Sequence, residues 1–173
     1  MLYFVRHGET DYNKNKIIQG QLDIPLNETG INQAKAVAED LKDYNFDVIY
    51  CSPLSRAKVT AETINKYHNV PIIFDDRLKE FDAGKREGMP FSSWEKTKNF
   101  ESIVSPNVYG GETNQDVFDR ASAFFKEIEN SDKNILIVSH NGVYRALYRY
   151  VNGLAVTDNS FPPIKNCVCE VLK

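Results

Sequence analysis

The sequence has 173 residues, a formal net charge of −3 and three cysteines. This length suits one domain with a substantial core, and the small negative charge argues against a nucleic acid or an anionic membrane surface as the partner. The apolar runs are far too short to span a bilayer, and no secretory signal is recognised. Because the cysteines are few, odd in number and not spaced for zinc, we expect a reduced, cytoplasmic protein.

Short strand-like runs and longer helical patterns alternate along the chain. The predicted elements are, in order, a strand at Leu2–Arg6, a helix at Gly30–Tyr44, a strand at Phe46–Cys51, a helix from Ser52 to about His68, a helix at Asn114–Asn130, a strand at Asn134–Ser139, a helix at Val143–Val151 and an alternating edge strand at Asn166–Leu172. Two of the strands are uniformly apolar, as in parallel sheets, and the helices carry one apolar stripe. This order predicts an α/β fold, a three-layer α/β/α sandwich with a mostly parallel central sheet and an antiparallel edge strand. We expect residues 1–173 to form a single domain.

The stretch at about residues 81–111 differs from the rest of the chain. It has weak periodicity, several glycines and prolines, and the scattered aromatics Phe91, Trp94, Phe100 and Tyr109. In open parallel sheets ligands bind beyond the carboxyl ends of the strands. We therefore expect this stretch to form a lid over that edge of the sheet.

Polar side chains follow three of the predicted strands. They are Arg6 and His7, then Ser52 with Arg56, then Ser139 and His140. Arginine matches the charge and geometry of a phosphoryl group, and a helix opened by Ser52 and Pro53 would add free N–H groups for the same anion. His7 and His140 each suit a nucleophile, an acid–base group or an oxyanion donor. Gly8 would let the backbone turn sharply and approach a ligand closely.

Further motifs continue this pattern along nearly the whole chain. They are "LYFVRHGETDYNKNKIIQGQLDIPLNETGINQA" at residues 2–34, "CSPLSRA" at 51–57, "RLKE" at 77–80 followed by Gly84, Glu87 and Gly88, "GGET" at 110–113 and "VSHNG" at 138–142. The tripeptide Arg-His-Gly alone is a weak signal, but all of these motifs together occur in the same order and spacing as in one known family. The sequence resembles the histidine phosphatase superfamily, that is, the phosphoglycerate mutase-like family, and within it the small phosphatase branch.

The resemblance implies a phosphoric monoester hydrolase that needs no metal or cofactor. It implies that His7 is the nucleophile, which becomes a phosphohistidine, and that Glu80 protonates the leaving oxygen and then deprotonates water. The other implied site residues are Arg6, Asn13, Arg56 and His140, which bind the phosphoryl oxygens, and Gln19, Gly20 and Asn141, which line the substrate pocket.

Phosphoryl transfer depends mainly on positioning and charge compensation, and these residue types can supply both. Two guanidinium groups and an imidazolium on His140 would provide positive charge without a metal. His7 must attack as a neutral imidazole, so we expect its other ring nitrogen to donate to a backbone carbonyl. Motif position favours Glu80 over its neighbours Asp82 and Glu87 as the acid. Metal-binding patterns such as HExxH and paired CxxC are absent from the sequence, and nearby arginines would repel a cation.

Two other functions remain as alternatives. A 2,3-bisphosphoglycerate-dependent phosphoglycerate mutase would share the first half-reaction. Mutases of this family carry an insertion with arginines for the substrate carboxylate, whereas Phe91–Tyr109 is short and has only Lys96 and Lys98. A phosphate-ligand binder without turnover would lack the nucleophile or the acid, and both are present here.

The expected substrate is a small phosphorylated metabolite, and its identity is open. The lid aromatics, together with Lys85 and Arg86, favour a partly apolar or aromatic leaving group. An exposed Cys169 on the edge strand would be compatible with a homodimer.

Overall fold

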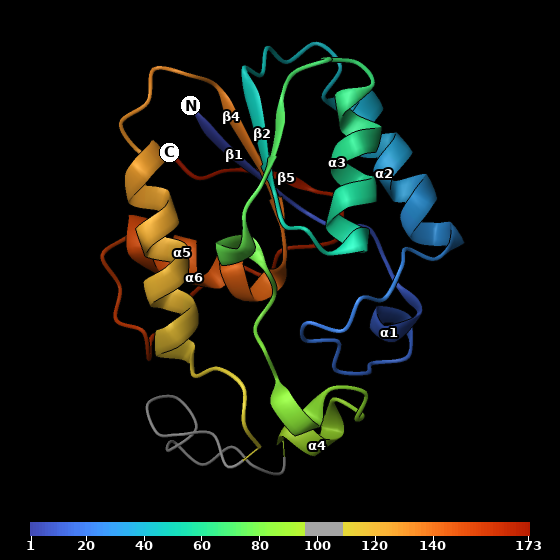
Figure 1. Ribbon diagram of the computed structural model, residues 1–173, viewed down its shortest axis with the longest axis vertical. Coiled ribbons are helices and arrows are strands. Elements are labelled where there is room, and N and C mark those ends of the chain that lie inside the picture. The colour runs from blue at the N-terminus through green and yellow to red at the C-terminus, as the bar shows by residue number, and fades with distance from the viewer. Residues whose placement is uncertain (96–108) are drawn as a thin grey trace.

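The described residues, 1–95 and 109–173 of the computed structural model, contain a five-stranded sheet with helices on both faces (Figure 1). Its strands are β1 (Leu2–Arg6), β2 (Val48–Cys51), β3 (Ile72–Phe74), β4 (Ile135–Ser139) and β5 (Cys169–Val171). They lie in the order β3-β2-β4-β1-β5, and β5 runs antiparallel to β1 while the other pairs are parallel. The predicted α/β fold, with a mostly parallel sheet and an antiparallel edge strand, is therefore confirmed.

Strand β4 lies at the centre of the sheet and sets the register for the functional edge. It is buried along its whole length. Arg6, the last residue of β1, pairs with Ser139, and Cys51, the last residue of β2, pairs with Val138. The carboxyl ends of β1, β4 and β2 therefore finish side by side, as the sequence pattern predicted.

Two helix pairs cover the two faces of the sheet (Figure 1). Helices α2 (Glu28–Asp40) and α3 (Ser55–Asn65) pack on one face, and α5 (Asn114–Ile128) and α6 (Asn141–Val151) pack on the other. Alternate residues of each strand point into opposite cores, because side chains alternate across a strand. The residues that follow the strand ends, among them His7, Ser52 and His140, are buried.

The remaining elements are short. They are α1 (Asp11–Lys14), η1 (Asp76–Leu78), η2 (Gly84–Arg86) and α4 (Ser92–Glu95). Residues 96–108, which include Phe100 and form part of the predicted lid, lie outside the described residues. Arg86 is buried and stacks on Tyr109, with its Cζ 4.1 Å from the ring centroid, so it is part of the packing of this stretch. None of the helices in the two described ranges is long and apolar enough to cross a membrane.

The predicted start of α3 is wrong. The helix begins at Ser55, its N-cap is Leu54, and within the described residues that cap makes no side-chain hydrogen bond. The Ser52 hydroxyl instead contacts His140. The helix also ends at Asn65, and strand β3, which is short and largely exposed, was not predicted.

The two cysteines near the C-terminus serve packing. Cys167 and Cys169 are half-buried against the core between the sheet and α2–α3. Burial raises the pKa of the Cys169 thiol to about 11. Cys169 is therefore less exposed than the sequence pattern suggested.

Candidate active site

The carboxyl ends of β1, β2 and β4 bring the two histidines of the sequence motifs together. The ring centroids of His7 and His140 lie 5.1 Å apart. Backbone bonds fix this edge: the His7 N–H donates to the Ser139 carbonyl at 3.0 Å, and the Ser52 N–H donates to the Val138 carbonyl at 3.0 Å. The sheet ladder thus continues one residue past the strand ends and holds the histidines at its rim.

His7 is held as a neutral imidazole with one free nitrogen. Its side chain is buried, and Nδ1 lies 2.7 Å from the Gly8 carbonyl oxygen, which can only accept, so Nδ1 carries the proton. Burial lowers the pKa of His7 well below its usual value, and the charges of Arg56 and Arg6 lower it further. The lone pair is therefore on Nε2, as the expected tautomer requires.

The loop after β1 is fixed from two distant parts of the chain. The Gly8 N–H donates to Thr60 Oγ1 of α3 at 3.2 Å, and Asn166 Nδ2 donates to the His7 carbonyl at 2.7 Å. A Cβ on Gly8 would overlap the backbone of Gly30 in α2. Gly8 is thus required for close packing against a helix, a reason that the sequence did not reveal.

His140 presents a second ring nitrogen to the same space. Its Nε2 lies 2.8 Å from Ser52 Oγ, which itself accepts from the Leu54 N–H, so the hydroxyl proton is available for Nε2. Nδ1 then carries the ring proton, and it is buried without a partner among the described residues. Burial, followed by the charge of Arg56, lowers the pKa of His140 well below its usual value. This shift favours the neutral form of His140, in contrast to the imidazolium expected from the sequence.

Two guanidinium groups complete the cluster. Arg56 is fully buried and donates to the carbonyls of Leu22 and Gly20 at 2.7 and 2.8 Å. Arg6 donates to the Ile164 carbonyl at 3.0 Å. In both, Nε is buried without a partner within the described ranges. Burial lowers the pKa of each guanidinium, and the Glu80 carboxylate opposes this shift most strongly.

Glu80 lies opposite, anchored by one of its two carboxylate oxygens. Oε1 accepts from the Phe81 N–H at 2.8 Å and from the Gly142 N–H of α6 at 2.9 Å. A Cβ at position 142 would overlap Oε1, so only glycine permits this contact. The neighbouring acids form different contacts. Asp82 accepts from the Gly84 N–H, and Glu87 accepts from the Gln21 N–H.

Comparison with known proteins agrees with this geometry. The model of the histidine phosphatase superfamily (branch 1) matches residues 2–173. The chain belongs to this superfamily. It is 42% identical over 151 residues to the uncharacterized phosphatase PhoE of Bacillus subtilis, which covers 86% of this chain and 76% of that protein. It is 34% identical to the probable phosphoglycerate mutase GpmB of Escherichia coli, over 96% of this chain and 81% of the relative.

Solved structures show the same relationship. A mycobacterial glucosyl-3-phosphoglycerate phosphatase in complex with VO3 has a TM-score of 0.86 and 28% sequence identity, covering 97% of this chain and 88% of that one. Sequence and fold thus both place the chain in the histidine phosphatase superfamily.

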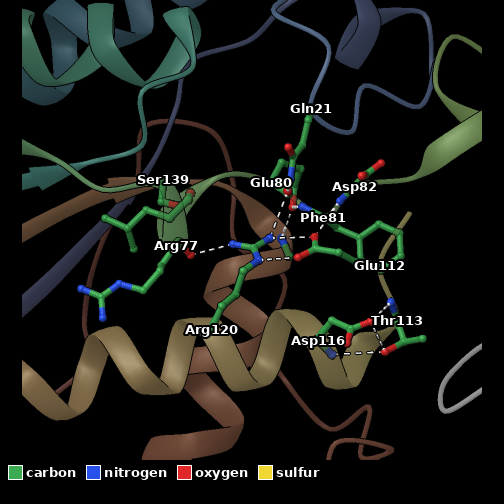
Figure 2. Close-up of polar contacts among 12 residues, drawn as sticks. Gln21, Arg77, Glu80, Phe81, Asp82, Glu112, Thr113, Asp116, Arg120 and Ser139 are labelled. Carbon is green, nitrogen blue, oxygen red and sulfur yellow. Dashed lines mark hydrogen bonds and ion pairs between the residues drawn. The ribbon is translucent and has the colours of Figure 1, made fainter. Parts of the chain in front are cut away.

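The backbone around Glu80 lies in a network of hydrogen bonds centred on Arg120 (Figure 2). Arg120 of α5 donates to the carbonyls of Arg77 and Glu80 at 2.6 and 3.1 Å. Its other bonds go to the two carboxylate oxygens of Glu112, at 2.6 and 3.0 Å. Glu112 in turn accepts from the Asp82 N–H at 2.9 Å. Arg120 therefore fixes the backbone on both sides of the candidate acid.

The structure also shows the surroundings of the weaker site predictions. Asn13 Oδ1 accepts from the Thr10 N–H, and the Asn13 N–H donates to Thr10 Oγ1, which closes a capping box on α1. Gln19 Oε1 accepts from the Thr10 hydroxyl at 2.8 Å. Both amide groups keep their NH2 ends free within the described residues, since no acceptor is bonded to them there. The Gly20 carbonyl holds Arg56, and Asn141 is the first residue of α6.

Sequence reasoning missed the residues that support this site. They are Gln21, Thr60, Glu112, Arg120 and Asn166, with Ser52 assigned only as a cap. Each acts through a contact between elements distant in the chain, and a single sequence gives no signal for such a pair. Among residues 1–95 and 109–173, no three His, Cys, Asp or Glu side chains gather as metal ligands would.

Proposed function

We propose that this histidine phosphatase hydrolyses a small phosphate monoester through a phosphohistidine on His7, with Glu80 as the proton donor and without a metal ion. One observation supports this most strongly: buried nitrogen atoms of Arg6, Arg56 and His140 lack a partner within the described residues. An unpaired buried polar group costs about 1–3 kcal/mol. A phosphoryl group has three oxygens that can accept from all three nitrogens and remove that cost.

Charge also supports a phosphoryl ligand. The guanidinium groups of Arg6 and Arg56 stay charged at any working pH and match a dianion. Neutral His140 adds a hydrogen-bond donor, Nδ1–H, without adding a third positive charge beside His7. Relatives named as phosphatases and as phosphoglycerate mutases are consistent with phosphoric monoester hydrolysis by this family.

In the first step, the Nε2 lone pair of His7 attacks phosphorus and the bond from phosphorus to the ester oxygen breaks. The departing oxygen takes the proton of the Glu80 carboxyl group, so the leaving group departs as an alcohol and Glu80 becomes a carboxylate. Oε1 of Glu80 already accepts two backbone N–H groups, which leaves Oε2 as the oxygen that carries the proton. Nδ1–H of His7 stays on the Gly8 carbonyl throughout.

In the second step, the Glu80 carboxylate takes a proton from water while the water oxygen attacks phosphorus. The bond between phosphorus and Nε2 breaks, and its electron pair returns to the ring. Inorganic phosphate leaves, and Glu80 is again protonated for the next turnover. Arg6 and Arg56 stay on the phosphoryl oxygens in both steps, where charge is redistributed.

The test is phosphate release from a panel of phosphate monoesters in excess EDTA, with wild type beside His7→Ala. We expect turnover by the wild type alone. An alkaline quench during turnover, followed by intact-mass analysis, should show a phosphorylated wild-type chain and an unmodified variant. Turnover by both proteins would exclude His7 as the nucleophile, and activity that EDTA abolishes would exclude the metal-free mechanism.

Phosphoglycerate mutase activity is the second candidate, because it shares the first step and because one relative carries that name. The two functions differ in the fate of the phosphoenzyme. A phosphatase transfers the group to water, whereas a mutase returns it to a substrate. Adding 2,3-bisphosphoglycerate and following interconversion of 3- and 2-phosphoglycerate separates them, because sustained interconversion without phosphate release would overturn the phosphatase proposal.

A further inference from the structure

Arg145 is a cation beside the site that the reaction steps above do not use. It lies on α6, one turn after Gly142, whose N–H holds Glu80. Residues three apart on a helix share a face, so Arg145 follows Gly142 along the side of α6 nearest Glu80. Its guanidinium stacks on Phe161, with Cζ 4.6 Å from the ring centroid, and within the described residues it has no hydrogen-bond acceptor and no ion pair.

The Phe161 ring is a fixed platform for this guanidinium. Arg149, one helical turn further on, also stacks on the ring at 4.9 Å. Arg149 is buried and donates to the Asp158 carbonyl at 2.7 Å, so it pins the loop that carries Phe161. The same loop supplies the Ile164 carbonyl that accepts from Arg6. Arg145 is thus held in place by the segment that also orients the phosphate-binding arginine.

Charge places Arg145 close to the reacting groups. Its charge contributes to lowering the pKa of Arg6, after the larger effect of burial. Arg145 itself is exposed to solvent; partial desolvation lowers its pKa, and the Glu80 carboxylate opposes that shift. Arg6 and Arg56 already match the two charges of a phosphoryl group. A third guanidinium near Glu80 therefore exceeds what the phosphoryl group needs.

We propose that Arg145 is a specificity-determining residue that binds a second anionic group, a carboxylate or a second phosphate, on the leaving-group side of the substrate. This inference rests on the proposed phosphatase function. Glu80 protonates the leaving oxygen, and Arg145 follows the N–H that holds Glu80 by three residues, or about 4.5 Å along the helix axis. The second anion thus belongs within a few bonds of the ester oxygen, and the leaving group is a short, charged alcohol.

Matched substrate pairs test the proposal. For a carboxylate, 3-phosphoglycerate is compared with glycerol 3-phosphate; for a second phosphate, fructose 1,6-bisphosphate is compared with fructose 6-phosphate. The proteins are wild type, Arg145→Ala, Arg145→Lys and, as a matched control, Lys165→Ala, which removes an exposed charge from the same loop. We measure kcat and KM for each pair in excess EDTA.

We expect Arg145→Ala to lower kcat/KM for the doubly anionic member of one pair by about 10- to 100-fold, mainly through KM, and to change its partner less than threefold. Arg145→Lys should recover part of the loss. Lys165→Ala should change kcat/KM equally for the two members of each pair. The pair that responds distinguishes a carboxylate from a second phosphate. Equal losses within both pairs, or equal effects of Arg145→Ala and Lys165→Ala, would overturn the subsite. An inactive wild type would instead overturn the proposed function.

Discussion

Two arginine-centred regions flank Glu80, and they differ in whether the side-chain donors are hydrogen-bonded within the protein. Around Arg6, Arg56 and His140, buried nitrogen atoms lack partners within the described residues. Around Arg120, the guanidinium makes four hydrogen bonds and the carbonyls and carboxylate it contacts are satisfied (Figure 2). Both regions hold charged groups away from water, and burying a charge costs free energy unless the charge is paired.

The difference shows how binding and positioning are divided between the two regions. Unpaired donors make the first region ready for an anion, because the ligand supplies the missing bonds. The donors of Arg120 are instead bonded within the protein, to Glu112 and to the backbone that carries Glu80. We expect substitutions in the first region to reduce activity more than stability, and substitutions in the second to do the reverse.

The largest effect is expected for Arg6→Ala. Removing a donor aimed at the transferring group should lower kcat/KM by about 100- to 1,000-fold. The free energy of unfolding should change by less than about 1 kcal/mol, because only one hydrogen bond to a backbone carbonyl is lost. Steady-state kinetics and chemical denaturation measure the two quantities. Near-normal activity with a large loss of stability would reverse the comparison.

Gly142→Ala should reduce kcat by about 100-fold, with a small change in KM. The added methyl group occupies the position of Glu80 Oε1 and displaces the acid from its backbone donor. General acid catalysis contributes roughly 100- to 10,000-fold, so even partial displacement is costly. The matched control is Glu80→Asp, whose shorter side chain avoids the methyl group. Gly142→Ala should add little further loss in that background, and fully additive losses would contradict the steric explanation.

Arg120→Ala should mainly destabilise the fold. Losing charge-assisted bonds to Glu112 and two backbone carbonyls should lower the free energy of unfolding by about 2–3 kcal/mol. Because Glu80 loses its backbone support, kcat should also fall, by about tenfold. Arg120→Lys should rescue little, since one ammonium group cannot reproduce a planar fork. Unchanged kcat in a folded Arg120→Ala protein would show that the network does not position the acid.

The smallest effect concerns pH. His7 and His140 have pKa values lowered by burial, so the unfolded chain binds their protons first as pH falls. Stability from this source is fully present above the unfolded pKa of about 6.5 and is lost as pH falls towards the folded values. Each histidine should contribute about 1 kcal/mol of loss between pH 6.5 and 5.5. Denaturation of His140→Gln at both pH values should show a smaller loss than the wild type, and an equal loss would contradict a buried neutral His140.

The strand ends could be predicted from the sequence because their signal is local. An apolar run that stops at Arg6 and His7, or at Ser139 and His140, marks both a strand and the edge where it finishes. The tautomer of His7 followed from its expected role, and the Gly8 carbonyl confirms it. The strand order is the further information needed to predict that these strand ends lie side by side.

The supporting contacts could not be predicted, because their partners are far apart along the chain. Ser52 carries a good helix-capping signal, yet its hydroxyl contacts His140, 88 residues later. The need for glycine at position 142 arises only from a side chain at position 80. Arg120 resembles any charged residue on an amphipathic helix until Glu112 and the Glu80 loop fold against it.

The hydrogen bond from Asn166 to the His7 carbonyl bears on the order in which contacts form during folding. His7 and Asn166 lie 159 residues apart, and β4, which pairs with β1, lies between them in the sequence. Contacts of such long sequence separation form late, since loop closure must precede them. A chain that lacked Asn166 would keep the pairing of β1 with β4 but would lose the hydrogen bond to the His7 carbonyl. We therefore expect the backbone at His7 to be fixed by Asn166 only after the sheet has formed.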